Sequence, residues 1–299
     1  MVKPMKPNKN SLIVVALFLA ALVGPSSGRA SVEGGQSPQA AQNAPARPAK
    51  DASLDVAFVF DFSKLDLASG DAAKDAALKA GCDTFARTTR DQVYPLLREI
   101  TGVALGKYYK EIQFRIVPTG GVPMKGAGGM ASRNQIWLEQ RYSVGRTPHP
   151  FDSHELIHVF NGCTHVLSGS SDHIWHAALM NVVQVRLGWG HVFRREDSVK
   201  NIAALCQKIE ADPNGPKAFE YRTAILGEEL NIASYDLGEE AVGRLYRNNI
   251  NPRPAGKPSA AMVSVWGKSA VHVQALMETL TRDYSFTIDD RIRKACGLS

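Results

Sequence analysis

The segment of residues 152–160 constrains the fold of this chain more than any other stretch. It contains His154, Glu155 and His158 in the pattern H-E-x-x-H. On a helix, residues four apart project from one face about 6 Å apart, so both imidazoles can bind one zinc ion. Glu155 can reach a water molecule on the metal without being a ligand itself. The pattern therefore predicts a helix that carries a hydrolytic metal site.

The surroundings of this pattern favour the same interpretation. Four apolar residues lie between and after the two histidines: Leu156, Ile157, Val159 and Phe160. They predict a buried helix, and polar side chains buried with it need a partner. Seven of the eight histidines fall within residues 149–191, and such clustering is expected of a metal site.

A second interpretation of these residues involves no metal. Asp152 followed three residues later by Glu155 matches a capping box, in which the glutamate satisfies backbone donors at a helix start. Thr147 followed by Pro148 is an equally good start, because proline loses no amide donor in a first turn. A helix over residues 147–161 leaves Glu155 available for chemistry.

The N-terminal residues have the features of a secretory signal. Lys3, Lys6 and Lys9 precede an apolar run at residues 12–23, which is too short to span a bilayer. We expect residues 1–30 to be a signal peptide. The mature protein would then be exported, to the periplasm or the extracellular space, without a stable membrane anchor.

The basic charge of the chain depends on this segment. Four of the 35 lysines and arginines lie in it and none of the 29 acidic residues does, so its removal lowers the net charge from +6 to +2. No basic run with interleaved aromatic residues remains. The composition therefore argues against a nucleic-acid partner.

The rest of the chain predicts an α+β protein. Residues 31–52 have almost no large apolar side chains and are expected to be a disordered linker. We expect residues 53–190 to form a small α/β lobe with a mixed sheet and the active-site helix, and residues 191–299 to form a mainly helical lobe. Helical patterns cover residues 71–101, 172–187, 198–211, 217–230, 239–249, 259–284 and 288–296.

Alternating apolar residues predict the strands of the sheet. Strands are expected at residues 54–62, 111–117 and 134–142. The third follows a glycine-rich loop, residues 120–132, to which we assign no nucleotide role. We expect this third strand to be an edge strand, to which an extended peptide could add; an ordinary interior strand is the alternative.

The four cysteines suggest two disulfides. Their positions are Cys82, Cys163, Cys206 and Cys296. An even number in an exported protein favours pairing, although the sequence does not choose among three pairings. Buried thiols are the alternative.

The order of these elements resembles that of the zincin metallopeptidases. Strand, helix, strand, edge strand, H-E-x-x-H helix and second helix cover roughly residues 54–187. The resemblance implies a catalytic zinc ion with three protein ligands, of which His154 and His158 are two. It also implies Glu155 as the general base.

The branches of that family differ in the third ligand. The metzincin pattern needs a glycine three residues after the second histidine and a third histidine at six; here Asn161 stands at three and His165 is one place late. The gluzincin branch has a glutamate on the next helix, where this chain has His176. The aspzincin branch uses an aspartate in a segment similar to the one that ends at Asp172.

We therefore expect a gluzincin-like layout with a non-standard third ligand, His176. Asp172 is the alternative, and the two would share a helical face, so that one could bind the metal and the other orient it. The remaining alternatives are His165, His173, Glu196 or a site that lacks a third protein ligand.

Together these features predict an exported, zinc-dependent hydrolase of the metallopeptidase class that acts on a peptide or protein. The unusual third ligand motivates the alternative, a non-catalytic exported metal-binding or interaction protein on a zincin scaffold.

Overall fold

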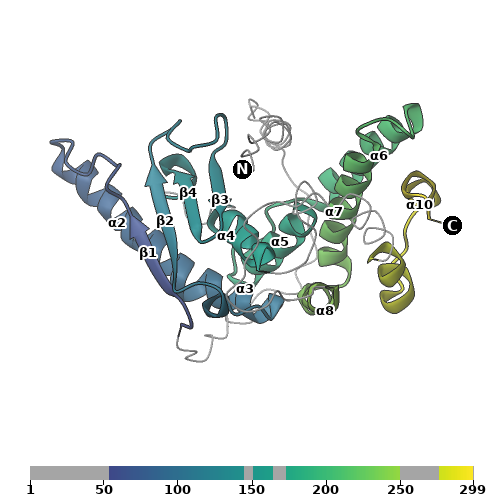
Figure 1. The fold of residues 1–299 in the computed structure, drawn as a ribbon, viewed down its shortest axis with the longest axis horizontal. Coiled ribbons are helices and arrows are strands. Elements are labelled where there is room, and N and C mark those ends of the chain that lie inside the picture. Colours follow the sequence, from purple (N-terminus) through teal and green to yellow (C-terminus); the bar gives the residue numbers. More distant parts are fainter. Residues whose placement is uncertain (1–53, 145–150, 164–172, 250–275, 299) are drawn as a thin grey trace, which may run out of the picture. The chain divides into compact units, whose positions relative to one another are not determined.

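A mixed four-stranded sheet forms the N-terminal part of the fold (Figure 1). Its strands are β1 (Ala57–Asp61), β2 (Glu111–Val117), β3 (Gly129–Ser132) and β4 (Gln135–Glu139). Their order in the sheet is β1-β2-β4-β3. The β1–β2 and β2–β4 pairs are parallel, whereas β3 runs antiparallel to β4.

The structure, a computed structural model, describes residues 54–144, 151–163, 173–249 and 276–298. These residues belong to one compact unit. A mixed sheet followed by a helical C-terminal part confirms the α+β class. The expected signal peptide, residues 1–30, and linker, residues 31–52, lie outside the described residues.

The edge of the sheet differs from the expectation. The strand predicted at residues 134–142 exists as β4, but it lies between β2 and β3 and is an interior strand. The edge strand on this side of the sheet is β3, which lies inside the glycine-rich segment, and β1 forms the opposite edge. Sequence alternation identified β4 because Ile136 and Leu138 are fully buried. The sequence pattern did not predict β3, because glycine has no side chain to contribute to an alternation of apolar and polar residues.

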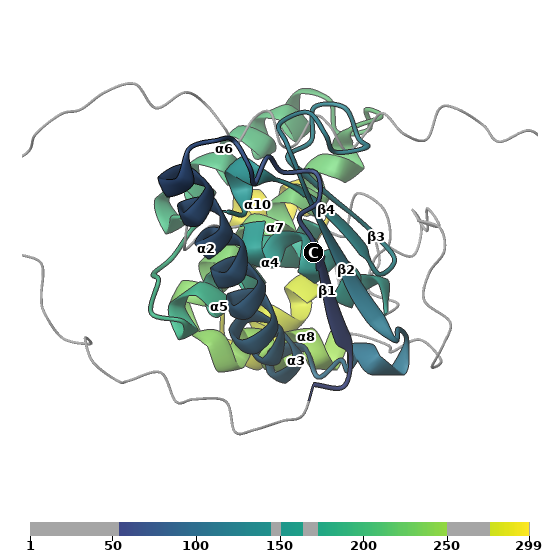
Figure 2. The ribbon, with the colours of Figure 1, turned by 90° about the vertical axis from the view of Figure 1, so that its left-hand side faces the viewer.

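One face of the sheet packs against helices. Along β2, Ile112, Phe114 and Ile116 point into the core and are at most 1 % exposed. The ring of Phe114 meets that of Phe85 at 5.9 Å, and Phe85 belongs to α2 (Ala72–Thr88). The helices α2 and α4 (Phe151–Gly162) lie beside the same face of the sheet (Figure 2).

The helix α2 continues into α3 (Tyr94–Thr101) through a π-helical turn, Thr89–Val93. Asp71 caps the start of α2 by accepting hydrogen bonds from two backbone amides. Pro95 explains the wider turn, because proline in a regular helix loses one hydrogen bond and collides with the carbonyl four residues earlier. The helix thus continues past a residue that would otherwise break it.

The remaining described elements are mainly helical. They are the 3-10 turns Leu105–Lys107 and Gln140–Tyr142, and the helices α5 (His176–Arg186), α6 (Arg195–Ala211), α7 (Ala218–Asp236), α8 (Glu239–Asn249), residues 276–284 and α10 (Asp290–Cys296). The helix expected at residues 239–249 has the predicted bounds, and that at 217–230 continues to Asp236. Among the described helices, none has the length and apolar character needed to cross a membrane.

The expectation of two disulfides is wrong for this structure. All four cysteines lie in the described residues, and they are thiols on four different helices or helix ends. Cys82, Cys163 and Cys206 are buried in the core, where a thiol packs as a small apolar group. Burial raises the pKa of Cys296 to about 12, so this thiol stays protonated at neutral pH.

A buried polar network joins α5 to α6 and α7. The Asn181 side-chain oxygen accepts hydrogen bonds from the amides of Val192 and Phe193 at 2.8 and 3.0 Å. Its amide nitrogen donates to the Phe193 carbonyl at 3.0 Å and to Asn231 Oδ1 at 2.6 Å. Asn231 in turn donates to Ser198 of α6 at 2.8 Å. The network uses both ends of the Asn181 amide and fixes the position of α5.

We expect Asn181→Leu to lower the free energy of unfolding by about 2–4 kcal/mol, because buried partners lose their hydrogen bonds while the side-chain volume is nearly kept. Urea denaturation measures this loss. The matched control is Asn248→Ala on the exposed face of α8, which should change stability by less than about 0.5 kcal/mol. Equal stabilities of the two variants would contradict a structural role for the network.

Candidate metal centre

The helix α4 carries three of the predicted site residues on one face. His154 and His158 are half-buried, and Glu155 is only 2 % exposed. The apolar residues among them hold the helix in the core: Leu156, Ile157, Val159 and Phe160 are at most 1 % exposed. Burial of this helix therefore brings polar side chains into the interior, where they need partners.

His176 begins the next helix, α5, and is 4 % exposed. Its position depends on Trp175, which is fully buried and meets the ring of Tyr246 edge-on at 5.0 Å. The Tyr246 hydroxyl donates a hydrogen bond of 2.7 Å to Asn161 Oδ1 near the end of α4. These contacts connect α4, α8 and the start of α5, and thereby set His176 opposite the α4 histidines.

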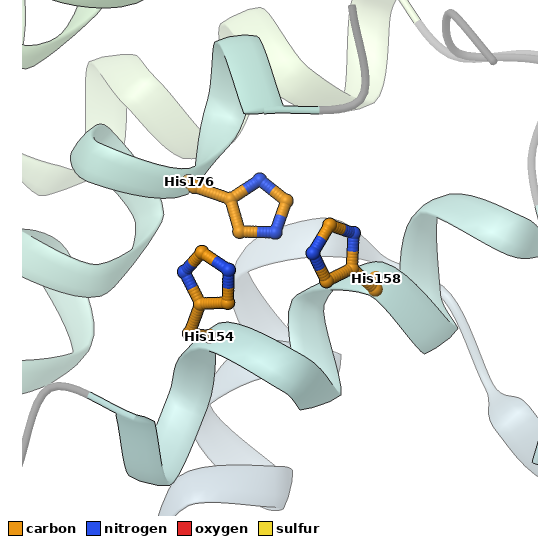
Figure 3. A group of neighbouring side chains, drawn as sticks. All are labelled: His154, His158 and His176. Atoms are coloured by element: carbon orange, nitrogen blue, oxygen red, sulfur yellow. The ribbon is translucent and has the colours of Figure 1, made fainter. Parts of the chain in front are cut away.

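The three imidazoles converge on one point (Figure 3). His154 and His158 project from α4 toward His176, which faces them from the other helix. Their ring centroids are 5.0 Å apart for His154 and His158, 4.5 Å for His154 and His176, and 4.2 Å for His158 and His176. One ring nitrogen from each lies within 4.8 Å of the others.

This donor set fits a metal ion. Two nitrogens bound to one tetrahedral zinc ion are about 3.4 Å apart, so small side-chain rotations would bring these donors into coordination. Metal binding needs neutral imidazoles. The pKa of His154 is held well below 6.5, first by burial and then by the neighbouring His158 and His173. His154 is thus neutral at physiological pH, as a ligand must be.

The structure distinguishes among the predicted third ligands that it describes. His176 joins the group, as expected. Glu196 is exposed in the first turn of α6 and is not a member of the group found in the described residues. Asp172 and His165 lie outside the described residues. His173, a minor candidate from sequence, has its ring 4.8 Å from those of both His158 and His176.

Gly129 is a site residue that sequence reasoning missed. A Cβ atom at this position would lie 2.4 Å from Glu155 Oε1 and 2.9 Å from Glu155 Cδ. The Glu155 carboxylate therefore lies against the edge strand β3, in space that only glycine leaves open. The glycine-rich composition of the segment was the available signal, but nothing in it singled out position 129.

Comparison with known proteins gives no match to a family model, to a curated protein or to a solved structure.

We expect His176→Ala to weaken metal binding by more than about tenfold, because a site with three protein donors loses one of them. Titration of the purified chain with zinc against a competing chelator measures the affinity. The control is His191→Ala, which removes an exposed imidazole that stacks on Tyr235 at 3.8 Å. Unchanged affinity in the His176 variant would exclude it as a ligand.

Proposed function

We propose that this protein is an exported, zinc-dependent hydrolase of the zincin type, and specifically a metallopeptidase. The observation that carries the proposal is the combination of three converging imidazoles with the Glu155 carboxylate on the same helix as two of them. A structural metal site has no need of a buried carboxylate at this position. Three histidines are also a donor set known from catalytic zinc sites.

In this proposal His154, His158 and His176 hold the ion. Zinc, when bound, would polarise a substrate carbonyl and lower the pKa of a water molecule. Glu155 takes the proton of the attacking water and passes it to the leaving amine. Because Glu155 is 2 % exposed, little bulk water competes for that proton.

The edge strand β3 supports a peptide as the substrate. Among the described strands, β3 pairs only with β4, so that its other side has backbone groups available to an extended chain. It contributes Gly129 beside Glu155, which puts this edge next to the proposed general base. We therefore assign to β3 the peptide-binding role that we had expected for the strand at 134–142.

A second candidate function is metal binding without catalysis. The nearness of His173 favours it, because four imidazoles could surround an ion and leave no position for water. Such a protein would be an exported metal-binding or interaction protein, and Glu155 would have no chemical role in it.

We expect Glu155→Gln to keep zinc and to lower the rate of peptide hydrolysis by about 10²- to 10⁴-fold, since glutamine has a similar shape but cannot take a proton. Hydrolysis of a fluorogenic peptide library, with zinc content measured on the same samples, tests this directly.

The control for this variant is Glu240→Gln on the exposed surface of α8, where the carboxylate forms an ion pair with Arg244. It should retain full activity. Full activity of Glu155→Gln would show the mechanism to be wrong, and absence of peptide hydrolysis by the zinc-loaded wild type would favour the non-catalytic candidate.

We expect Gly129→Ala to lower kcat at least about tenfold while zinc affinity is retained, because the added methyl group displaces the Glu155 carboxylate from its position. Activity and zinc titration of the same preparation separate these two effects.

Gly162→Ala is the matched control, since a Cβ atom there meets nothing within 4 Å and the residue lies at the end of the same helix, α4. It should leave both kcat and zinc affinity unchanged. If Gly129→Ala behaved like this control, the space at Gly129 would have no part in positioning Glu155.

A further inference from the structure

A fourth histidine lies beside the three converging imidazoles. His173 is half-buried in the single helical turn of residues 173–175 that precedes α5. Its ring centroid is 5.6 Å from that of His154, 4.8 Å from that of His158 and 4.8 Å from that of His176. His173 therefore approaches all three rings.

The six separations among the four rings define a tetrahedron. They all fall between 4.2 and 5.6 Å, and four points with nearly equal mutual distances can only occupy the corners of a tetrahedron. Imidazoles on one tetrahedral zinc ion, with bonds of about 2.1 Å, have their ring centroids about 5 Å apart. The ring positions therefore have the shape and size of four-histidine coordination, and a rotation of the His173 side chain would turn one of its nitrogens toward the group formed by the other three.

We propose that His173 is a fourth protein ligand in the closed, resting state of the metal centre. This inference rests on the metal site of the proposed function. It adds that site's regulation: His173 occupies the position that water or a substrate carbonyl needs, so hydrolysis requires His173 to withdraw.

The local structure distinguishes His173 from the other three ligands. His154 and His158 belong to the buried helix α4, and His176 belongs to α5 and follows the fully buried Trp175. His173 lies outside the regular helix, in one short turn. Ile174 and Trp175 of the same turn are buried, so His173 would leave by rotation of its side chain, without movement of α4 or α5.

X-ray absorption spectroscopy of the zinc-loaded full-length chain tests this inference, because it counts imidazole ligands without requiring activity. We expect four imidazoles in the wild type. In His173→Ala we expect three imidazoles and one non-protein ligand, zinc affinity at least tenfold lower, and faster peptide hydrolysis than in the wild type. His173→Gln provides a second variant that keeps a polar side chain in the turn, and His191→Ala should behave as the wild type.

The possible results separate this inference from the proposed function. Three imidazoles in both the wild type and His173→Ala would overturn the fourth ligand while leaving the hydrolase proposal in place. Four imidazoles in the wild type and three in the variant, with neither protein hydrolysing peptides, would support the fourth ligand and overturn the hydrolase. A wild type that binds no zinc would overturn both.

Discussion

The candidate metal centre depends on the fixed position of α5 relative to α4. Two donors come from one helix and would meet on any regular helix, but the third comes from another element and is useful only if that element cannot shift. Trp175 provides this constraint immediately before His176, since it is fully buried against Tyr246. Farther along α5, Asn181 fixes the helix to its neighbours through hydrogen bonds at both ends of its amide.

The same packing creates the chemistry of the site. Apolar residues draw α4 into the core, and the histidines and Glu155 are drawn in with them. Burial lowers the pKa of His154, which keeps its nitrogen available for a metal rather than for a proton. The stability of the core and the convergence of the candidate ligands thus have one cause, and a change that loosened α4 would affect both.

Local patterns predicted much of the fold. Alternating apolar residues predicted the bounds of β2, and helical spacing predicted those of α8. The i, i+1, i+4 spacing of His154, Glu155 and His158 predicted that they share one helix, as they do in α4. His176 was predicted from a family layout and does join the group. In each case the information lies within one element or in the order of elements.

Three features could not be read from the sequence, since they depend on contacts between distant segments. The edge position of β3 follows from the strand order, and the role of Gly129 follows from the approach of Glu155 26 residues later along the chain. Nothing in the sequence favoured His173 over the other minor candidates, because its nearness to His154 and His158 depends on how the segment before α5 packs against α4. The four thiols also show that an even cysteine count does not imply disulfides.

The π-helical turn between α2 and α3 determines which side of this long helix faces the core after residue 93. A turn with an extra residue advances the following side chains by about 100° around the helix axis. Before the turn, the ring of Phe85 contacts Phe60 and Phe114 of the sheet. After it, the ring of Tyr94 contacts both Phe58 of β1, at 5.0 Å, and Phe160 of α4, at 5.8 Å. The extra residue shifts the apolar stripe around the helix so that Tyr94 lies against the sheet and α4 together, and deleting one residue from the turn would rotate the second half of the helix away from both.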